Sequence, residues 1–556
     1  MSFSSLRAHI NPFVLLLLFL SVSACGGSSG SASSSSKNTT TGGVGVSNTV
    51  SSPGEMTVGD MYSLQLTSGD TEEVSFDGVD SSAQFIMIVG NTKEGGTGSL
   101  VQASNDLSLA DLSSKSLIPE LDEESDTSVD DDGDEETEYG ASAVFDAWLR
   151  AAESDVALEE GWLDPSPTLG KGVSKSVIVG DSETFRVLSS LSSVTAYVEV
   201  DATAKYVGDN IIFYLDDRAD DSHLSASDII TLGDMYDDMA GTEFSILGDA
   251  SDVDGDGKVA ILATFQLNIL SEAASGIITG YNFSADVHPR SGSNPASNER
   301  EIVYQIMCDP NGDYGPTISK SFCLSNLLPA VFPHELQHSI NYNQHVFVSG
   351  GSIEQSWLNE AISHFMEDYF GYGNENPSRY ALYLNNTATT GIVTTSSPSL
   401  YERGGGYLFL RFLYEQSGKS TTFLQSLEQT SLRGTENIEA AFGGAADFDQ
   451  FSEFFGRWSV ALAMTNAGVT RDSRYIFEDR TYNSTTGNWE GVCLSCDADD
   501  NRGTTLTGVR TYSHTSYSSA SLDSSAAKFY TISSPPSTLS FSGTSDNDYI
   551  LLIRTE

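Results

Sequence analysis

The sequence predicts an α+β protein, with a main domain of sheet plus helices flanked by small β-domains. Alternating runs rich in β-branched and aromatic residues indicate strands near both ends of the chain and before residue 220. From residue 333 to 467, apolar residues recur mainly at helical spacing. A length of 556 residues with 39% apolar content is enough for several domains with buried cores.

The chain is strongly acidic. It has 27 Lys and Arg against 77 Asp and Glu, a net charge of −50. This balance disfavours nucleic acid and anionic membrane surfaces as partners and favours a solvated surface. The sequence does not indicate an oligomeric state.

The N-terminus predicts export. Arg7 precedes an apolar run, Phe13 to Leu20, which is too short to cross a bilayer. The following Val-Ser-Ala-Cys resembles the bacterial lipobox, which implies removal of residues 1–24 and lipid attachment at Cys25. Gly26 after it favours the outer membrane or cell surface, so contact with the membrane is expected through the lipid anchor only. The alternative is an ordinary secretory signal cut nearby.

Composition then divides the chain into segments. They are a signal peptide (1–24), a Ser/Gly-rich tether (25–53), an N-terminal β-domain (54–119), an acidic linker (120–138), the main domain (139–472) and a C-terminal β-domain (473–556). The runs MYSLQL, EEVSF and QFIMIVG predict strands of the first β-domain, and KFYTI, STLSFSG and DYILLIR predict strands of the second. The N-terminal β-domain suits substrate binding, a spacer or a prodomain equally.

The main domain begins with a predicted amphipathic helix over residues 141–158. Strands are expected in SKSVIVG, ETFRVL, VTAYVEVDATAKYVG and NIIFYLDD, and a helix over 225–239 with Ser225 as its cap. Further helices are expected in LYERGGGYLFLRFLYEQSG, in TTFLQSLEQTS and over 448–467, with Gly418 as a stop between the first two.

Asp252, Asp254 and Asp256 open like a calcium-binding loop, because they alternate and Gly257 follows. The closing glutamate of a complete EF-hand is missing, since Ala263 stands at position twelve. A calcium-binding hairpin and a plain acidic turn both remain open.

The segment His334-Glu335-Leu336-Gln337-His338 spells H-E-x-x-H. On a helix, residues four apart lie one above the other, so the two imidazoles face one metal ion as ligands. Glu335 lies about a hundred degrees round the helix, where it is placed to act as a general base on water. A catalytic zinc needs a third protein ligand. Glu360, in Trp-Leu-Asn-Glu-Ala at the start of a second predicted helix, is the candidate.

These segments resemble the gluzincin zinc peptidases. WLNEAISHFME is similar to the aminopeptidase branch, which implies a zincin-type fold, Glu360 as third zinc ligand and Glu367 as the carboxylate that holds a ligand histidine. Tyr401-Glu402-Arg403-Gly404 resembles the same branch's Y-E-K-G stretch, which implies that the Tyr401 hydroxyl donates to the oxyanion. In such folds a strand before the zinc helix edges the cleft and pairs with substrate, and REIVYQIM (300–307) is expected in that place.

The arrangement is closer to hyicolysin-like bacterial metallopeptidases than to aminopeptidases. The G-x-M-E-N segment that binds a substrate amino group is absent, which favours a zinc endopeptidase acting on proteins or peptides. Pro333 leaves the start of the zinc helix open, since proline suits a first helical position. An aminopeptidase and a non-catalytic surface adhesin are the alternatives, and chelator-sensitive cleavage of casein separates the adhesin from both enzymes.

Two other histidines lie near these segments in the sequence. His364 lies one turn after Glu360 and is a rival ligand, although the Asn-Glu pair favours the carboxylate. His345 is expected in a loop, away from the metal.

If Cys25 carries lipid, four cysteines remain in an oxidising compartment. The local pairing predicts disulfides Cys308–Cys323 and Cys493–Cys496. The second is a C-x-x-C, which can be redox-active, but no thioredoxin-like context surrounds it, so a structural bridge is favoured.

Overall fold

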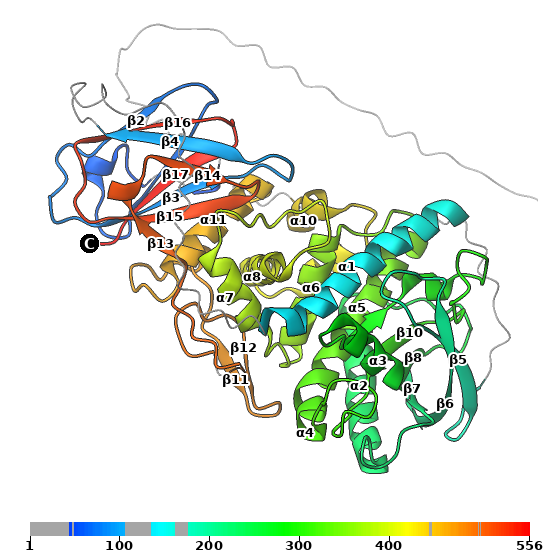
Figure 1. Ribbon diagram of the computed structural model, residues 1–556. Coiled ribbons are helices and arrows are strands. Elements are labelled where there is room, and N and C mark those ends of the chain that lie inside the picture. The colour runs from blue at the N-terminus through cyan, green and yellow to red at the C-terminus, as the bar shows by residue number, and fades with distance from the viewer. Residues whose placement is uncertain are drawn as a thin grey trace, which may run out of the picture. The chain divides into compact units, whose positions relative to one another are not determined.

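The computed structural model describes residues 44–46, 49–105, 135–161, 176–443, 448–498, 500 and 502–556. The predicted signal peptide, Cys25 and most of the tether lie outside these residues. The described chain is mixed helix and sheet, in agreement with the predicted α+β class (Figure 1). No helix in this part is both long and apolar enough to cross a membrane.

A six-stranded sheet forms one half of the main domain, in the order β5-β6-β7-β8-β10-β9. Its strands are β5 (Ser182–Leu188), β6 (Tyr197–Val207), β7 (Ile211–Asp216), β8 (Val259–Thr264), β9 (Gly280–Asn282) and β10 (Ile302–Ile306). The strands β7, β8 and β10 pair in parallel, and the others join antiparallel. Every residue of the three parallel strands is buried, as expected for strands covered on both faces.

Two predictions about this sheet are wrong, namely the edge position of one strand and the existence of another. The segment REIVYQIM is β10, but β10 lies between β8 and β9, so the short strand β9 is the free edge. Three residues are too few for a recognisable alternation, which is why β9 escapes detection in the sequence. Of SKSVIVG, residues 176–180 form no strand, and Ile178 and Val179 are exposed. This segment is rich in β-branched residues, but residues 176–180 do not pair with a neighbouring strand.

The other half of the main domain is helical. Its helices and those beside the sheet are α2 (Ala226–Ile246), α3 (Phe265–Ala274), α4 (Lys320–Phe322), α5 (Leu328–Tyr342), α6 (Ser356–Tyr369), α7 (Asn376–Asn385), α8 (Leu400–Gln416), α9 (Thr421–Glu428), α10 (Gly434–Phe442) and α11 (Phe451–Met464). Helix α5 contacts β9 and β10 as well as α6, and α6 in turn packs against α8. The zinc-motif helix therefore lies between the sheet and the helical half.

The predicted cap Ser225 and stop Gly418 are confirmed, and a further cap is present at Ser399. Ser225 caps α2 in a reciprocal capping box with Asp228, and Ser399 caps α8 in the same way with Glu402. Gly418, with φ 75°, follows α8 in the left-handed conformation that glycine adopts without strain.

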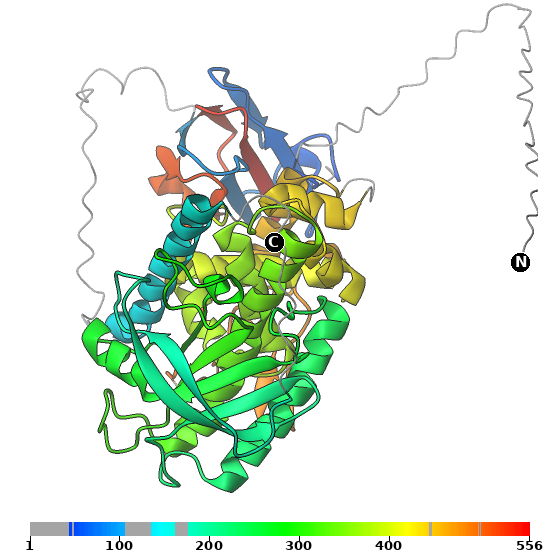
Figure 2. The ribbon, with the colours of Figure 1, turned by 90° about the vertical axis from the view of Figure 1, so that its right-hand side faces the viewer.

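A β-sandwich joins the two ends of the chain. One sheet has the order β1-β17-β3-β15-β13 and the other β14-β4-β16-β2. The strands are β1 (Met61–Gln65), β2 (Glu72–Ser75), β3 (Phe85–Asn91), β4 (Ser99–Asn105), β13 (Thr511–Ser513), β14 (Ser519–Leu522), β15 (Ala526–Ile532), β16 (Thr538–Gly543) and β17 (Asp548–Arg554). Blue N-terminal and red C-terminal strands alternate in both views (Figure 1, Figure 2).

The prediction of two separate β-domains, 54–119 and 473–556, is therefore wrong. In the shared sheet Ile88 of β3 is opposite Leu551 of β17, so neither segment completes a sheet alone. The remaining strands of the C-terminal segment, β11 (Thr481–Asn483) and β12 (Asn488–Glu490), form a separate hairpin.

Helix α1 (Glu135–Glu160) is longer than the predicted 141–158 helix. The acidic linker prediction is wrong for residues 135–138, which are helical, while residues 120–134 lie outside the described chain. Acidic side chains in a first helical turn interact favourably with the helix dipole, so the acidic composition is compatible with a helix start.

Both predicted cysteine pairs are disulfides in the structure. Cys308 and Cys323 are joined just before α5, with Cα atoms 5.6 Å apart, and Cys493 is joined to Cys496. The first bridge fixes the segment that leads into the zinc-motif helix.

Candidate metal centre

Helix α5 carries His334, Glu335 and His338 and runs through Pro333 rather than starting there. Pro329 occupies the first turn instead, where a missing backbone N–H costs nothing. Wider π-helical turns, Cys323–Leu327 and Asn343–Val348, flank the helix on both sides. Its buried position between sheet and helices supplies the packing that offsets an internal proline.

Glu360 reaches both motif histidines from α6. Its Oε2 lies 3.6 Å from His334 Nε2, and its Oε1 lies 3.4 Å from His338 Nε2. The three residues offer ligand atoms that all lie within 4.8 Å of one another. The structure therefore brings together the three predicted ligands from two helices that are distant in sequence.

The outer nitrogens of the two imidazoles are held by other side chains. His334 Nδ1 lies 2.9 Å from Glu367 Oε1, and His338 Nδ1 lies 3.1 Å from Asn359 Oδ1. An acceptor at Nδ1 selects the tautomer whose Nε2 carries the lone pair. Both Nε2 atoms are then able to bind a cation beside Glu360.

The donor set fits a zinc ion. Two imidazoles and one carboxylate are a common catalytic zinc set, with one position left to solvent. Glu360 Oε1 is buried and has no hydrogen-bond partner, as expected of an oxygen that a cation would occupy. Burial alone would raise the pKa of Glu360, but Arg403 and the two histidines outweigh it and hold that pKa well below its usual value. Glu360 is therefore ionised and able to serve as a ligand.

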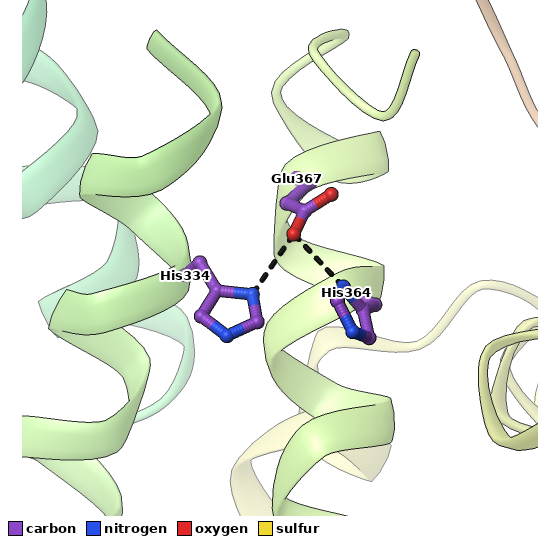
Figure 3. A group of neighbouring side chains, drawn as sticks. All are labelled: His334, His364 and Glu367. Carbon is purple, nitrogen blue, oxygen red and sulfur yellow. Dashed lines mark hydrogen bonds and ion pairs between the residues drawn. The ribbon is translucent and has the colours of Figure 1, made fainter. Parts of the chain in front are cut away.

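A second group shares His334 with the first. It consists of His334, His364 and Glu367, and Figure 3 shows both Nδ1 atoms converging on one oxygen of Glu367. The His364 Nδ1 lies 2.8 Å from that oxygen, and Arg379 contacts the other at 3.3 Å. Because hydrogen bonds already occupy this carboxylate, it suits the role of a support more than that of a ligand.

His364 remains close to the first group. Its Nε2 is buried without a hydrogen-bond partner and lies 3.9 Å from Glu360 Oε2. Burial and the nearby Arg379 lower the pKa of His364 to about 3, so the ring is neutral. His345, by contrast, lies in the π-helical turn after α5 and not in a loop, and its Nε2 is 3.1 Å from the Leu427 carbonyl oxygen.

Glu335 faces the sheet side of the centre. Its Oε2 accepts a hydrogen bond of 2.9 Å from the backbone N–H of Asn282, at the end of β9. Burial raises the pKa of Glu335, which the two motif histidines partly offset. A carboxylate with a raised pKa, fixed beside a metal group, is suited to accepting and returning a proton.

A small cavity of about 80 Å³ opens onto these residues. Its lining includes His334, Glu335 and His364, together with Leu400 and Arg403 from the first turns of α8. The half-buried Tyr401 lies between these two residues in the sequence but is not among the lining residues. Its predicted role at the oxyanion stays a prediction.

Arg403 is a site residue that the sequence reading did not single out. Its guanidinium is buried, donates to Glu360 Oε2 and contacts Asp146 Oδ2 of α1 at 2.7 Å. The available signal was its place two residues after Tyr401, within the Tyr-Glu-Arg-Gly stretch.

The aspartate run occupies a turn between α2 and β8. Backbone N–H groups of the turn donate to all three carboxylates, from Gly257 to Asp252, from Asp256 to Asp254 and from Lys258 to Asp256. Arg300 contacts Asp254 at 3.4 Å and Asp256 at 3.2 Å. Asp252, Asp254 and Asp256 do form a group of possible cation ligands, but a guanidinium already provides positive charge there.

Comparison with models of known protein families and with curated proteins found no match for this chain.

Proposed function

We propose that this chain is a zinc-dependent endopeptidase of the gluzincin type, with a zincin-type catalytic domain. The observation that carries the proposal is the position of the Glu360 carboxylate, within 3.6 Å of the Nε2 atoms of both motif histidines. Glu335 lies on the same helix as the two histidines and is hydrogen-bonded to the sheet edge, which supports a role as the base.

His334, His338 and Glu360 are the residues that would hold the zinc ion. When bound, zinc polarises a carbonyl group and lowers the pKa of water towards neutrality. Glu367 and Asn359 orient the two imidazoles through their Nδ1 atoms.

Glu335 takes the proton from the water that attacks the peptide carbonyl and passes it to the leaving amine. The Asn282 N–H holds this carboxylate in place. Tyr401 is proposed to donate to the oxyanion, a role that rests on its position in the Tyr-Glu-Arg-Gly stretch.

The protein is further proposed to be exported and anchored by lipid at Cys25. The support is the lipobox-like sequence and the even number of remaining cysteines, which pair in the structure. Labelling cells with an alkyne-tagged fatty acid tests this claim: label is expected on the wild type and not on Cys25→Ser.

The test of the catalytic proposal is casein cleavage combined with zinc analysis. The wild type is expected to bind one zinc ion and to lose cleavage when a chelator is added. Glu335→Gln is expected to keep the zinc and lose cleavage, whereas Glu436→Gln, an exposed glutamate on α10, serves as the matched control and keeps both. Full proteolysis by Glu335→Gln would refute the assignment, and peptides with blocked N-termini distinguish an endopeptidase from an aminopeptidase.

A further inference from the structure

Helix α1 reaches into the catalytic cavity. Ser142, Ala143 and Asp146 of α1 line the cavity that contains His334 and Glu335. Asp146 Oδ2 accepts from Arg403 at 2.7 Å, and Arg403 also donates to the proposed ligand Glu360. The Asp146 carboxylate of α1 is thus linked to the proposed ligand Glu360 through the side chain of Arg403.

The same helix occupies the free edge of the six-stranded sheet. Arg150 donates to the backbone oxygen of Asn282, and Glu153 Oε1 accepts from the backbone N–H of Ser284 at 2.6 Å. Asn282 ends β9 and Ser284 begins the short 3-10 helix that follows, so the Asn282 carbonyl oxygen is the group of the strand itself with which an added strand would pair. Arg150 of α1 therefore occupies the Asn282 carbonyl oxygen at this edge, and the Asn282 N–H is taken by Glu335 of α5.

Apolar and ionic contacts seat the helix there. Phe145 and Leu149 are buried, and the Phe145 ring packs edge-on against Tyr281 of β9 at a centroid distance of 5.6 Å. Arg150, which contacts β9, and Glu153, which contacts Ser284, also pair with each other at 2.9 Å. The helix also contacts the short 3-10 helix Ser284–Val287.

Open space continues on the far side of these contacts. A second cavity, of about 410 Å³, is lined by Arg150, Glu153 and Ser154 of α1 and by Asn359 of α6. The helix therefore contributes to the walls of two cavities, one at the metal group and one farther along.

We infer that α1 is an autoinhibitory helix, which occupies the peptide-binding cleft and must leave it before a protein substrate can pair with β9. The inference rests on the proposed function in one respect, namely that the molecule which α1 excludes is a protein substrate. The contacts with Arg403, Asn282 and Ser284 exist whatever the activity.

The test is the charge-neutral double variant Arg150→Ala/Glu153→Ala in the full chain, with Asp155→Ala, an exposed carboxylate on the same helix, as control. Loss of two buried side-chain bonds is expected to raise casein cleavage about tenfold. Hydrogen exchange of residues 280–284 and the rate of zinc removal by a chelator are expected to rise as well. The control is expected to match the wild type in all three measurements.

A synthetic peptide of residues 141–157 is then added to the double variant. It is expected to restore inhibition, and a scrambled peptide is not. A melting temperature close to that of the wild type shows that the rest of the fold is intact.

The outcomes separate the two proposals. Unchanged exchange at 280–284 and unchanged zinc removal would refute a displaceable α1, and faster exchange with reduced cleavage would show that α1 belongs to the active architecture. If neither the wild type nor the variant cleaves casein, the proposed function fails. Hydrogen exchange of residues 280–284 and the rate of zinc removal then still decide whether α1 covers the centre.

Discussion

The histidine–glutamate group (His334, His338, Glu360) and the aspartate loop (Asp252, Asp254, Asp256) each bring three ligand atoms within 4.8 Å of one another. Each also contacts one arginine, Arg403 in the first case and Arg300 in the second. They differ in what else satisfies the ligand atoms. The imidazole Nε2 atoms and Glu360 Oε1 converge in a buried place, whereas backbone N–H groups and Arg300 already bond the loop carboxylates.

Ligand type and spacing alone predict both groups as possible metal sites. The two groups differ in whether neighbouring donors already bond their ligand atoms. A buried acceptor without a hydrogen-bond donor is unusual in a folded protein, and such an atom is suited to binding a cation. An acidic turn whose oxygens are bonded by its own backbone is stable without one.

Removing Glu360 has the largest expected effect. Glu360→Ala is expected to lower zinc affinity more than about a hundredfold and to abolish cleavage. The variant removes a proposed metal ligand, and this loss exceeds the roughly tenfold to hundredfold cost of losing a residue that only supports a ligand. Zinc stoichiometry after dialysis measures this, with His364→Ala as the control that keeps zinc. Zinc loss in His364→Ala with retention in Glu360→Ala would place the ion in the group of His334, His364 and Glu367.

Tyr401→Phe is expected to lower turnover about a hundredfold while zinc content stays at the wild-type value, because a single oxyanion donor is lost. Steady-state kinetics on a peptide substrate measures it. Wild-type turnover in this variant would exclude Tyr401 as the oxyanion donor. Arg403, which lines the cavity, would then be the candidate for that role.

Glu367→Gln is expected to weaken zinc binding about tenfold to a hundredfold, since an amide oxygen is a poorer acceptor for the two Nδ1–H groups. Competition with a fluorescent chelator measures the affinity. Glu375→Gln, another carboxylate at the cavity, is the matched control, and equal losses in the two variants would deny Glu367 a special role.

The aspartate loop is expected to respond least. Calcium is expected to leave the melting temperature unchanged, because Arg300 and backbone N–H groups already bond the loop carboxylates. A rise in melting temperature that disappears in Asp252→Ala/Asp254→Ala would establish a calcium site instead.

The loop also predicts a pH dependence. Burial raises the pKa of Asp256 from 3.8 to about 6. The like charge of Asp254 adds to this rise, and the attraction of Arg300 opposes it. A raised carboxyl pKa means that the folded state binds the proton more tightly, so stability is greatest below the unfolded pKa and falls as pH rises from about 4 to about 6. Asp256→Asn is expected to flatten this slope in urea unfolding, and an unchanged slope would count against the shift.

Local patterns predicted the local parts of this molecule. The H-E-x-x-H spacing and the Trp-Leu-Asn-Glu segment predicted α5, α6 and three side chains that the structure brings together. Period-two runs likewise predicted β15, β16 and β17.

What depends on distant packing was not predicted. The pairing of β3 with β17 joins segments at opposite ends of the chain, and nothing in either strand specifies its partner. Arg403 reaches Glu360 only because α8 packs on α6, and Asp146 reaches Arg403 only because α1 lies beside α8. The internal Pro333 is tolerated because α5 is buried on several sides, which its own sequence does not reveal.

The central claim is the location of one metal ion, and anomalous diffraction at the zinc edge from crystals of the purified protein tests it most directly. The account predicts a single peak bonded to His334 Nε2, His338 Nε2 and a Glu360 oxygen, at about 2.0 to 2.2 Å from each. A peak between His364 and Glu367, or no peak in protein that cleaves casein, would contradict it.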